Sequence, residues 1–201
     1  IIRDESIGNY GWNDNDTNDW PNATLKNYLN LGDYWTNSLG EEAKNMIGDT
    51  FWYLGGSSTY FDVTASMFYE RERGTTVYEG RSTNWIGKIG LMYPSDYGYA
   101  TSGGITTDRN TCLNKELFNW DSSSYSDCKN NDWLYRVDEA RWTITPNAGS
   151  SDSAITRNTT GYVRYNGVRL QAPIFPTTFI KSDVKIVEGD GSSSNPYQLS
   201  E

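Results

Sequence analysis

The sequence contains no histidine. Histidine is the commonest general base and the commonest transition-metal ligand in proteins. Its absence excludes a Ser–His–Asp triad and disfavours a zinc enzyme. Basic residues are also scarce. The chain has 17 Lys and Arg and 26 Asp and Glu, which gives a net charge of −9. A surface of this sign disfavours nucleic acid and anionic membrane surfaces as partners.

Cysteines are few, and no long hydrophobic run is present. Only Cys112 and Cys128 occur, separated by a short, turn-rich segment whose spacing fits no zinc pattern. We predict one disulfide that closes a surface loop and contributes about 3 kcal/mol to stability, the alternative being two free cytosolic thiols. A disulfide is typical of extracellular proteins, so we expect an extracellular or cell-surface domain. The sequence shows no signal peptide or transmembrane segment, so we expect this domain to reach a membrane only through an anchor outside this sequence.

Aromatic residues are abundant and compensate for a low hydrophobic content of 36%. They make up 14% of the 201 residues and include 8 Trp and 15 Tyr. A few large rings can replace many aliphatic side chains, so we predict a single domain with an aromatic core. We expect five tryptophans to lie in that core or to pin loops, namely Trp52, Trp85, Trp120, Trp133 and Trp142. An exposed tryptophan would instead favour a carbohydrate ligand.

The hydrophobic pattern predicts two short helices early in the chain and mostly strands and loops after them. Leu25, Tyr28 and Leu29 lie on one helical face over 23–30, and Ser38 is the expected N-cap of a second helix that ends near Gly48. The segment 58–85 fits either a strand or a short helix followed by an extended stretch. The strands that we expect are 1–7, 50–56, 89–93, one or two within 131–147, a hairpin over 153–166 that turns at 158–161, and one or two within 172–187.

Several segments resemble surface proteins of gut-dwelling Firmicutes and related bacteria. They include "NMIGDTFWYLGG", "CLNKELFNWDSSSYSDCKNNDWLY", "WTITPN" and "PTTFIKSDVKIVEGDGSSSNPYQL". Such proteins commonly carry an N-terminal prepilin-like helix before an ectodomain that is similar to C-type-lectin-fold domains. The resemblance implies an α+β, C-type-lectin-like fold over residues 1–201, with two short early helices, a small antiparallel sheet and a long loop-rich insertion.

Some of these relatives are targets of diversity-generating retroelements, which mutate codons at adenines in a region near the C-terminus. The resemblance implies a framework that includes Trp142, Pro146 and 176–186, with a variable region at about 147–175. The ligand-binding residues that it implies are Ser150, Asp152, Ser153, Thr156, Arg157, Asn158, Thr160, Tyr162, Arg164, Tyr165, Asn166, Arg169 and Phe175. Relatives tend to have Arg where this chain has Phe175, so either Phe175 is itself diversified or the framework differs there.

The composition of the predicted hairpin also points to contact with a ligand. In "GYVRYN", strand alternation places Val163 towards the core and Tyr162 and Arg164 on the opposite face. No Lys or Glu occurs between Arg141 and Leu170, although these residues usually solvate a strand face. Tyr and Arg are typical hot-spot residues, and Ser and Asn adapt their hydrogen bonds. The alternative is that Thr, Tyr and Ser simply suit exposed strands.

Sites of other kinds have weaker support. Asp14, Asp16 and Asp19 form a loose cluster of hard oxygens, but they lack the Gly and terminal Glu of an EF-hand loop. No Glu-Pro-Asn or Gln-Pro-Asp sugar-binding triplet occurs, so we predict no metal and no cofactor.

An enzyme is the least favoured class. Glu70, Glu72 and Glu79 could supply a carboxylate pair for glycoside hydrolysis, although such pairs are common by chance. We therefore expect a non-enzymatic domain that binds a protein ligand or cell-surface receptor. The alternatives are a carbohydrate-binding adhesin module and a structural minor pilin subunit.

Overall fold

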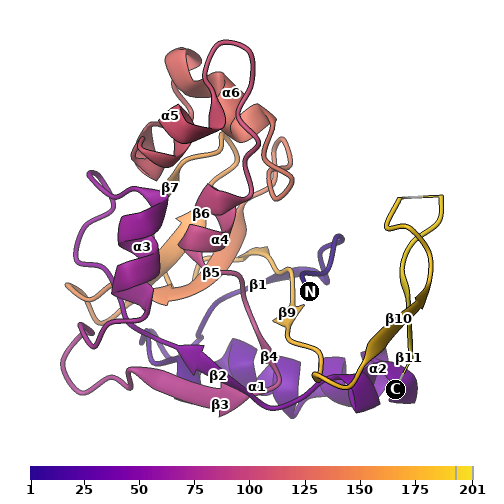
Figure 1. The fold of residues 1–201 in the computed structure, drawn as a ribbon. Helices are drawn as coiled ribbons and strands as arrows, with labels where there is room; N and C mark the ends of the chain where they lie inside the picture. The colour runs from indigo at the N-terminus through magenta and orange to yellow at the C-terminus, as the bar shows by residue number, and fades with distance from the viewer. Residues whose placement is uncertain (193, 201) are drawn as a thin grey trace.

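A three-stranded antiparallel sheet, in the order β5-β6-β7, lies at the centre of the molecule between two groups of helices (Figure 1). The computed structural model describes residues 1–192 and 194–200. The chain has a mixed α/β fold of small antiparallel sheets and short helices. Its strands are β1 (Asn9–Tyr10), β2 (Thr50–Tyr53), β3 (Asn84–Gly87), β4 (Ile89–Gly90), β5 (Arg141–Pro146), β6 (Ser153–Arg157), β7 (Val163–Gly167), β8 (Ala172–Pro173), β9 (Thr177–Thr178), β10 (Lys185–Glu188) and β11 (Gln198–Ser200).

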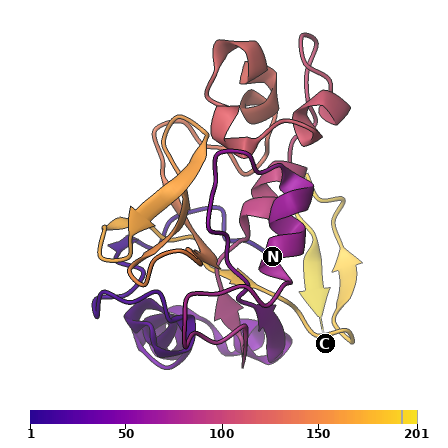
Figure 2. The same ribbon diagram turned by 90° about the vertical axis from the view of Figure 1, so that its left-hand side faces the viewer.

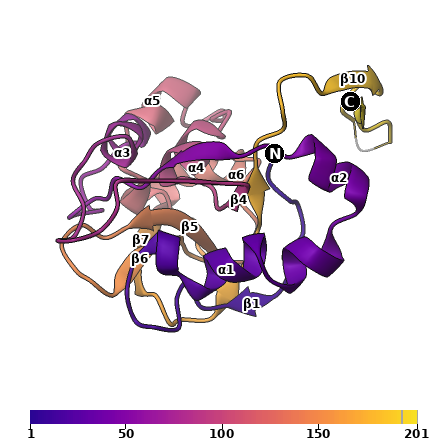
Figure 3. The ribbon, with the colours of Figure 1, turned by 90° about the horizontal axis from the view of Figure 1, so that it is seen from below.

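The helical segments lie on both sides of this sheet. α1 and α2 lie on one side and are nearest the viewer in Figure 3, whereas α3 to α6 lie on the other. Their bounds are η1 (Trp20–Asn22), α1 (Thr24–Asn30), η2 (Tyr34–Ser38), α2 (Glu41–Met46), α3 (Ala65–Glu72), α4 (Pro94–Tyr99), α5 (Arg109–Leu113), η3 (Leu117–Asn119), η4 (Ser123–Tyr125) and α6 (Ser126–Asn130).

Early and late segments of the chain pair with one another. β1 pairs with β8 and β4 pairs with β9, both antiparallel. β2 pairs with β3, and β10 with β11. The β10–β11 hairpin extends away from the rest of the molecule in Figures 1 and 2. The N-terminal and C-terminal parts of the chain therefore belong to the same folded body.

Strands β5 and β6 of the central sheet are buried on both faces, because successive residues of β6 point into different cores. Ala154 belongs to the first core cluster, which also contains Trp12, Trp20 and Trp142. Ile155 belongs to the second, which packs α3, α4 and the disulfide against the sheet. This arrangement explains why all six residues of β5 are buried.

Five tryptophans are almost completely buried, which confirms the predicted aromatic core: Trp12, Trp20, Trp52, Trp120 and Trp142. Trp133 does not follow the prediction, because its side chain is 62% exposed. Trp85 is half-buried. The cysteine prediction is confirmed, since Cys112 in α5 and Cys128 in α6 form a disulfide with a Cα–Cα distance of 5.4 Å. Both cysteines are buried in the second core cluster, so the bond ties the two short helices to the core.

Most predicted elements are present, and three of them differ in bounds or capping. The first helix is found as α1, but Ser38 ends η2, and Gly40 holds the N-cap position of α2 without a side-chain cap. Of the two alternatives for residues 58–85, the short helix is present as α3, which Thr64 caps. The first regular strand is β1 rather than 1–7, where only Ile2 makes a bridge, to Thr177. The strand expected over 89–93 is shorter, because Pro94 begins α4.

Candidate binding surface on the β6–β7 hairpin

The β6–β7 hairpin forms where the sequence predicts it, and its register defines two faces. Thr156 pairs with Arg164 and Ala154 with Asn166, whereas Ile155 pairs with Tyr165. Directly opposed residues lie on the same face of a sheet, so Arg164 and Tyr165 point to opposite sides of β7. β7 is the edge strand of this sheet. Residues on both of its faces can therefore contribute to the surface.

The residues predicted to bind a ligand divide into three groups by exposure. Asp152, Thr160, Arg164 and Arg169 are exposed. The half-buried ones are Ser150, Ser153, Asn158, Tyr162, Tyr165 and Asn166. Thr156, Arg157 and Phe175 are buried, with at most 4% of each exposed. The prediction that these last three belong to the displayed face is wrong.

Arg157 is buried because its guanidinium group holds the loop over 131–140. It donates to the carbonyl oxygens of Arg136 at 3.2 Å and Leu134 at 3.5 Å, and also to that of Glu139. The ring of Tyr135 lies 5.3 Å from the guanidinium carbon. Burial lowers the pKa of Arg157. Arg157 is thus part of the frame that supports the hairpin.

Thr156 and Phe175 also have structural partners. The Thr156 hydroxyl accepts a hydrogen bond of 2.6 Å from Asn166 Nδ2, which fixes a side chain of the neighbouring edge strand. The Phe175 ring lies 3.5 Å beneath the guanidinium carbon of Arg141, which is itself buried. A polar or large substitution at either position would have to displace these contacts.

Side-chain and backbone hydrogen bonds fix the turn between β6 and β7. Asn158 Oδ1 accepts from the backbone N–H groups of Thr160, Gly161 and Tyr162 at 3.1–3.2 Å. Gly161 has a φ of +99°, and a Cβ atom there would lie 2.7 Å from the side chain of Lys129. Asn158 is therefore a turn-forming residue rather than a freely displayed one.

The connection between β5 and β6 is also held by the frame. Asn18, which is 2% exposed, donates through Nδ2 to the carbonyl oxygens of Asn147, Ser150 and Ser153 at 2.8–2.9 Å. Arg81 donates to Asn18 Oδ1 at 3.2 Å. Neither residue is recognisable from sequence, because each is far from the hairpin along the chain.

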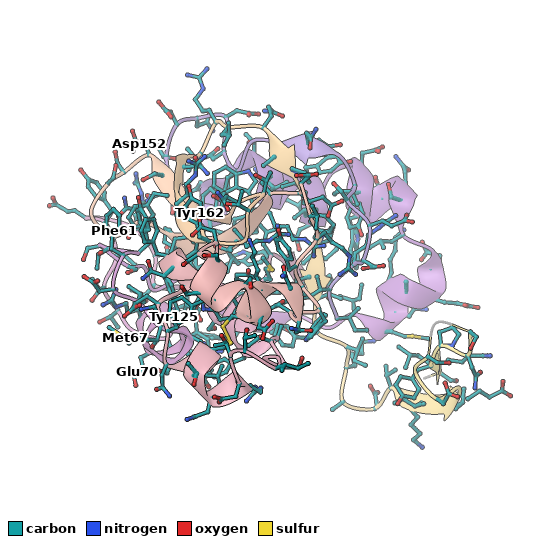
Figure 4. The ribbon with its side chains drawn as sticks, turned by 90° about the horizontal axis from the view of Figure 1, so that it is seen from above. Phe61, Met67, Glu70, Tyr125, Asp152 and Tyr162 are labelled. Carbon is teal, nitrogen blue, oxygen red and sulfur yellow. A yellow bond between two sulfur atoms is a disulfide. The ribbon has the colours of Figure 1, made fainter. Side chains whose placement is uncertain are left out.

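Five aromatic rings from three segments meet beside the hairpin, and we call them the aromatic cluster: Tyr60, Phe61, Phe118, Tyr162 and Tyr165. The centroids of Tyr60 and Tyr165 are 4.8 Å apart, and those of Phe118 and Tyr162 are 5.4 Å apart. Phe61 is 49% exposed. Figure 4 shows Phe61 and Tyr162 on the same side of the molecule, seen from above.

Tyr162 therefore lies differently from the prediction. It precedes the first residue of β7, so the strand alternation that would align it with Arg164 does not extend to it. Its ring joins that of Tyr165 in the aromatic cluster, on the side opposite Arg164. Val163 is buried, as predicted. The hairpin thus offers two adjoining surfaces, one aromatic and one that carries Arg164 and Asn166.

The contacts of Tyr165 fix its position within the aromatic cluster. Its hydroxyl donates to the Ser57 carbonyl oxygen at 2.5 Å, and burial raises its pKa to about 12. The ring is thus held in one orientation before any ligand arrives. A rigid aromatic side chain of this kind contributes contact area at a low cost in conformational entropy.

The glutamates considered for hydrolysis do not come together around a cleft. Glu72 is buried against the N-terminus of α4, where it accepts from Ser95 N at 2.9 Å, whereas Glu70 and Glu79 are exposed. Within residues 1–192 and 194–200, no group of three or more His, Cys, Asp or Glu side chains is placed to hold a metal ion. In the same ranges no helix is long and apolar enough to cross a membrane.

Comparison of the chain with protein-family models, curated proteins and solved structures gives no match.

Proposed function

We propose that this chain is an extracellular ligand-binding domain whose β6–β7 hairpin and aromatic cluster contact a protein ligand. The observation that carries the proposal is the aromatic cluster, whose rings are packed against one another while Phe61 remains half exposed. Tyr and Arg side chains in such a setting are typical of interface hot spots, and Phe is enriched at protein interfaces. The side chain of the neighbouring Arg164 is exposed, and its guanidinium group makes no hydrogen bond or ion pair with another described residue.

The rigidity of the hairpin supports this function. Asn18, Arg157 and Asn158 fix both ends of β6 through hydrogen bonds to backbone groups. A surface that is held in place loses less conformational entropy when a ligand binds. Exposed side chains on such a frame can also be exchanged at little cost to folding.

We further propose a C-type-lectin-like fold and diversification of the hairpin by a retroelement. Two early helices, a small antiparallel sheet and a long loop-rich segment support the fold. The resemblance in sequence, together with the exposed Asp152, Thr160, Arg164 and Arg169, supports the diversification. The frame residues Thr156, Arg157 and Phe175 are left out of the diversified set.

Sequencing the DNA that flanks the gene tests the diversification. We expect a reverse transcriptase gene and a near-copy of the segment that encodes about 142–180, with differences only at adenines. These differences should fall in codons for exposed hairpin residues such as Arg164 and Arg169, and should spare Thr156 and Arg157. If no such copy exists, the assignment of a variable face fails.

A further inference from the structure

A groove whose residues are distant in sequence from the hairpin is lined by two half-buried tryptophans. Trp35 from η2 and Trp85 from β3 line a groove of about 450 Å³ together with Lys26, Asp49 and Lys88. The exposed aliphatic side chains of Leu31 and Ile86 also line it and are 72% and 66% exposed. The groove thus combines apolar ring surface with charged groups, which is typical of small-ligand sites.

Both indole rings are held by the fold. The Trp85 ring lies edge-on to Trp20, with centroids 6.2 Å apart, and covers Gly87, where a Cβ atom would lie 2.0 Å from the ring. Trp35 packs against the first core cluster, and Lys88 Nζ lies 5.8 Å from the centroid of its ring. A ligand that stacks on either ring would therefore find it already in position.

The charges in the groove are positive on balance, although the whole chain carries −9. Lys88 Nζ forms an ion pair of 2.7 Å with Asp49, which leaves Lys26 as the excess charge. Lys26 Nζ donates to Asn27 Oδ1 at 2.8 Å and has no carboxylate partner among the described residues. Partial burial lowers the pKa of Lys26 because it removes water from the charged ammonium group. An anion beside this group would compensate for the lost water.

We propose that this groove binds an acidic saccharide, with a sugar ring stacked on Trp35 or Trp85 and its carboxylate paired with Lys26. The C–H face of a pyranose complements the negative face of an indole ring. The sugar hydroxyls can exchange hydrogen bonds with Lys88 and Asp49 at the rim. A proline-rich peptide would stack equally well, but it would supply no carboxylate to balance the charge of Lys26.

Titration calorimetry with three probes tests the proposal: 3′-sialyllactose, a galacturonic acid trisaccharide and neutral lactose. We expect at least one acidic probe to bind at millimolar concentration and lactose to bind at least about tenfold more weakly. Which acidic probe binds distinguishes sialic acid from uronic acid as the source of the carboxylate.

Matched variants locate the site. Lys26→Gln should weaken binding by about tenfold, and so should Trp35→Ala or Trp85→Ala, depending on which ring the sugar stacks on. Trp133→Ala and Lys185→Gln should leave binding unchanged. Circular dichroism checks that the tryptophan variants are folded. Lys26→Gln removes only the charge at the end of a side chain, so it tests the site without removing a packed ring. The proposal is overturned if neither acidic probe binds, if lactose binds equally well, or if Lys26→Gln has no effect. It is also overturned if a proline-rich peptide binds in the groove and the acidic probes do not. None of these outcomes bears on the hairpin surface.

Discussion

Replacing Arg157 with alanine is expected to lower the free energy of unfolding by about 3 kcal/mol. The substitution removes the donor that the carbonyl oxygens of Leu134, Arg136 and Glu139 share, and it leaves a cavity beside the second core cluster. Arg157→Lys should recover only a small part of this loss, because an ammonium group lacks the planar fork that reaches several carbonyl groups. Urea denaturation followed by circular dichroism measures the change.

Arg164→Ala is the matched control, because Arg164 lies on the neighbouring strand, carries the same charge and is exposed. We expect it to change the free energy of unfolding by less than about 0.5 kcal/mol. Hydrogen exchange should also quicken over residues 134–139 in the Arg157 variant and remain unchanged in the Arg164 variant. Equal and small effects of the two substitutions would show that Arg157 does not support the hairpin.

The stability of the protein is expected to fall as the pH rises from about 5 to 8, and Glu72 should account for a large part of the fall. Burial raises the pKa of Glu72 from 4.5 to about 8 and outweighs the two hydrogen bonds from Ser95 and the nearby charge of Arg73. Below pH 4.5 Glu72 is protonated in both states. Between 4.5 and 8 it ionises in the unfolded chain alone, which favours unfolding by on the order of 5 kcal/mol in total. Above pH 8 it is ionised in both states, and its contribution no longer changes.

Glu72→Gln isolates this contribution, because glutamine keeps a neutral hydrogen-bonding group beside Ser95. We expect the stability of the variant relative to the parent to rise through the same pH range, since the variant has no proton to lose. The difference between the two urea-denaturation profiles cancels other groups, including Asp132, whose pKa burial also raises to about 8. A difference that is constant with pH would contradict the assignment of a neutral Glu72 in the folded protein.

The sequence predicts the hairpin well because its signals are local. Alternation identifies β6 and β7, Val163 is correctly placed in the core, and Asn158 with Gly161 marks the turn. The same alternation cannot show that a second core cluster covers the other face of the sheet. The resemblance implies that Thr156 and Arg157 belong to the ligand-binding set, but hydrogen bonds allow both to be buried in the frame.

Long-range contacts account for what the sequence could not show about the binding surface. Tyr60, Phe61 and Phe118 come from segments more than 40 residues before Tyr162, and no periodicity links them to it. Sequence reasoning did anticipate the kind of side chain at the surface, since Tyr162 and Tyr165 are both in the aromatic cluster. It did not anticipate that the cluster and Arg164 lie on opposite sides of the edge strand.

Comparison of two display libraries tests most directly whether the hairpin combines an exchangeable surface with a fixed frame. The first library randomises exposed positions, and the second randomises an equal number of buried ones. The exposed positions are Asp152, Arg164 and Arg169, and the buried ones are Thr156, Arg157 and Phe175. We predict that most members of the first library fold and that selection on unrelated proteins yields specific binders, whereas most members of the second do not fold. Equal loss of folding in both libraries, or a folded first library without any binder, would contradict the account.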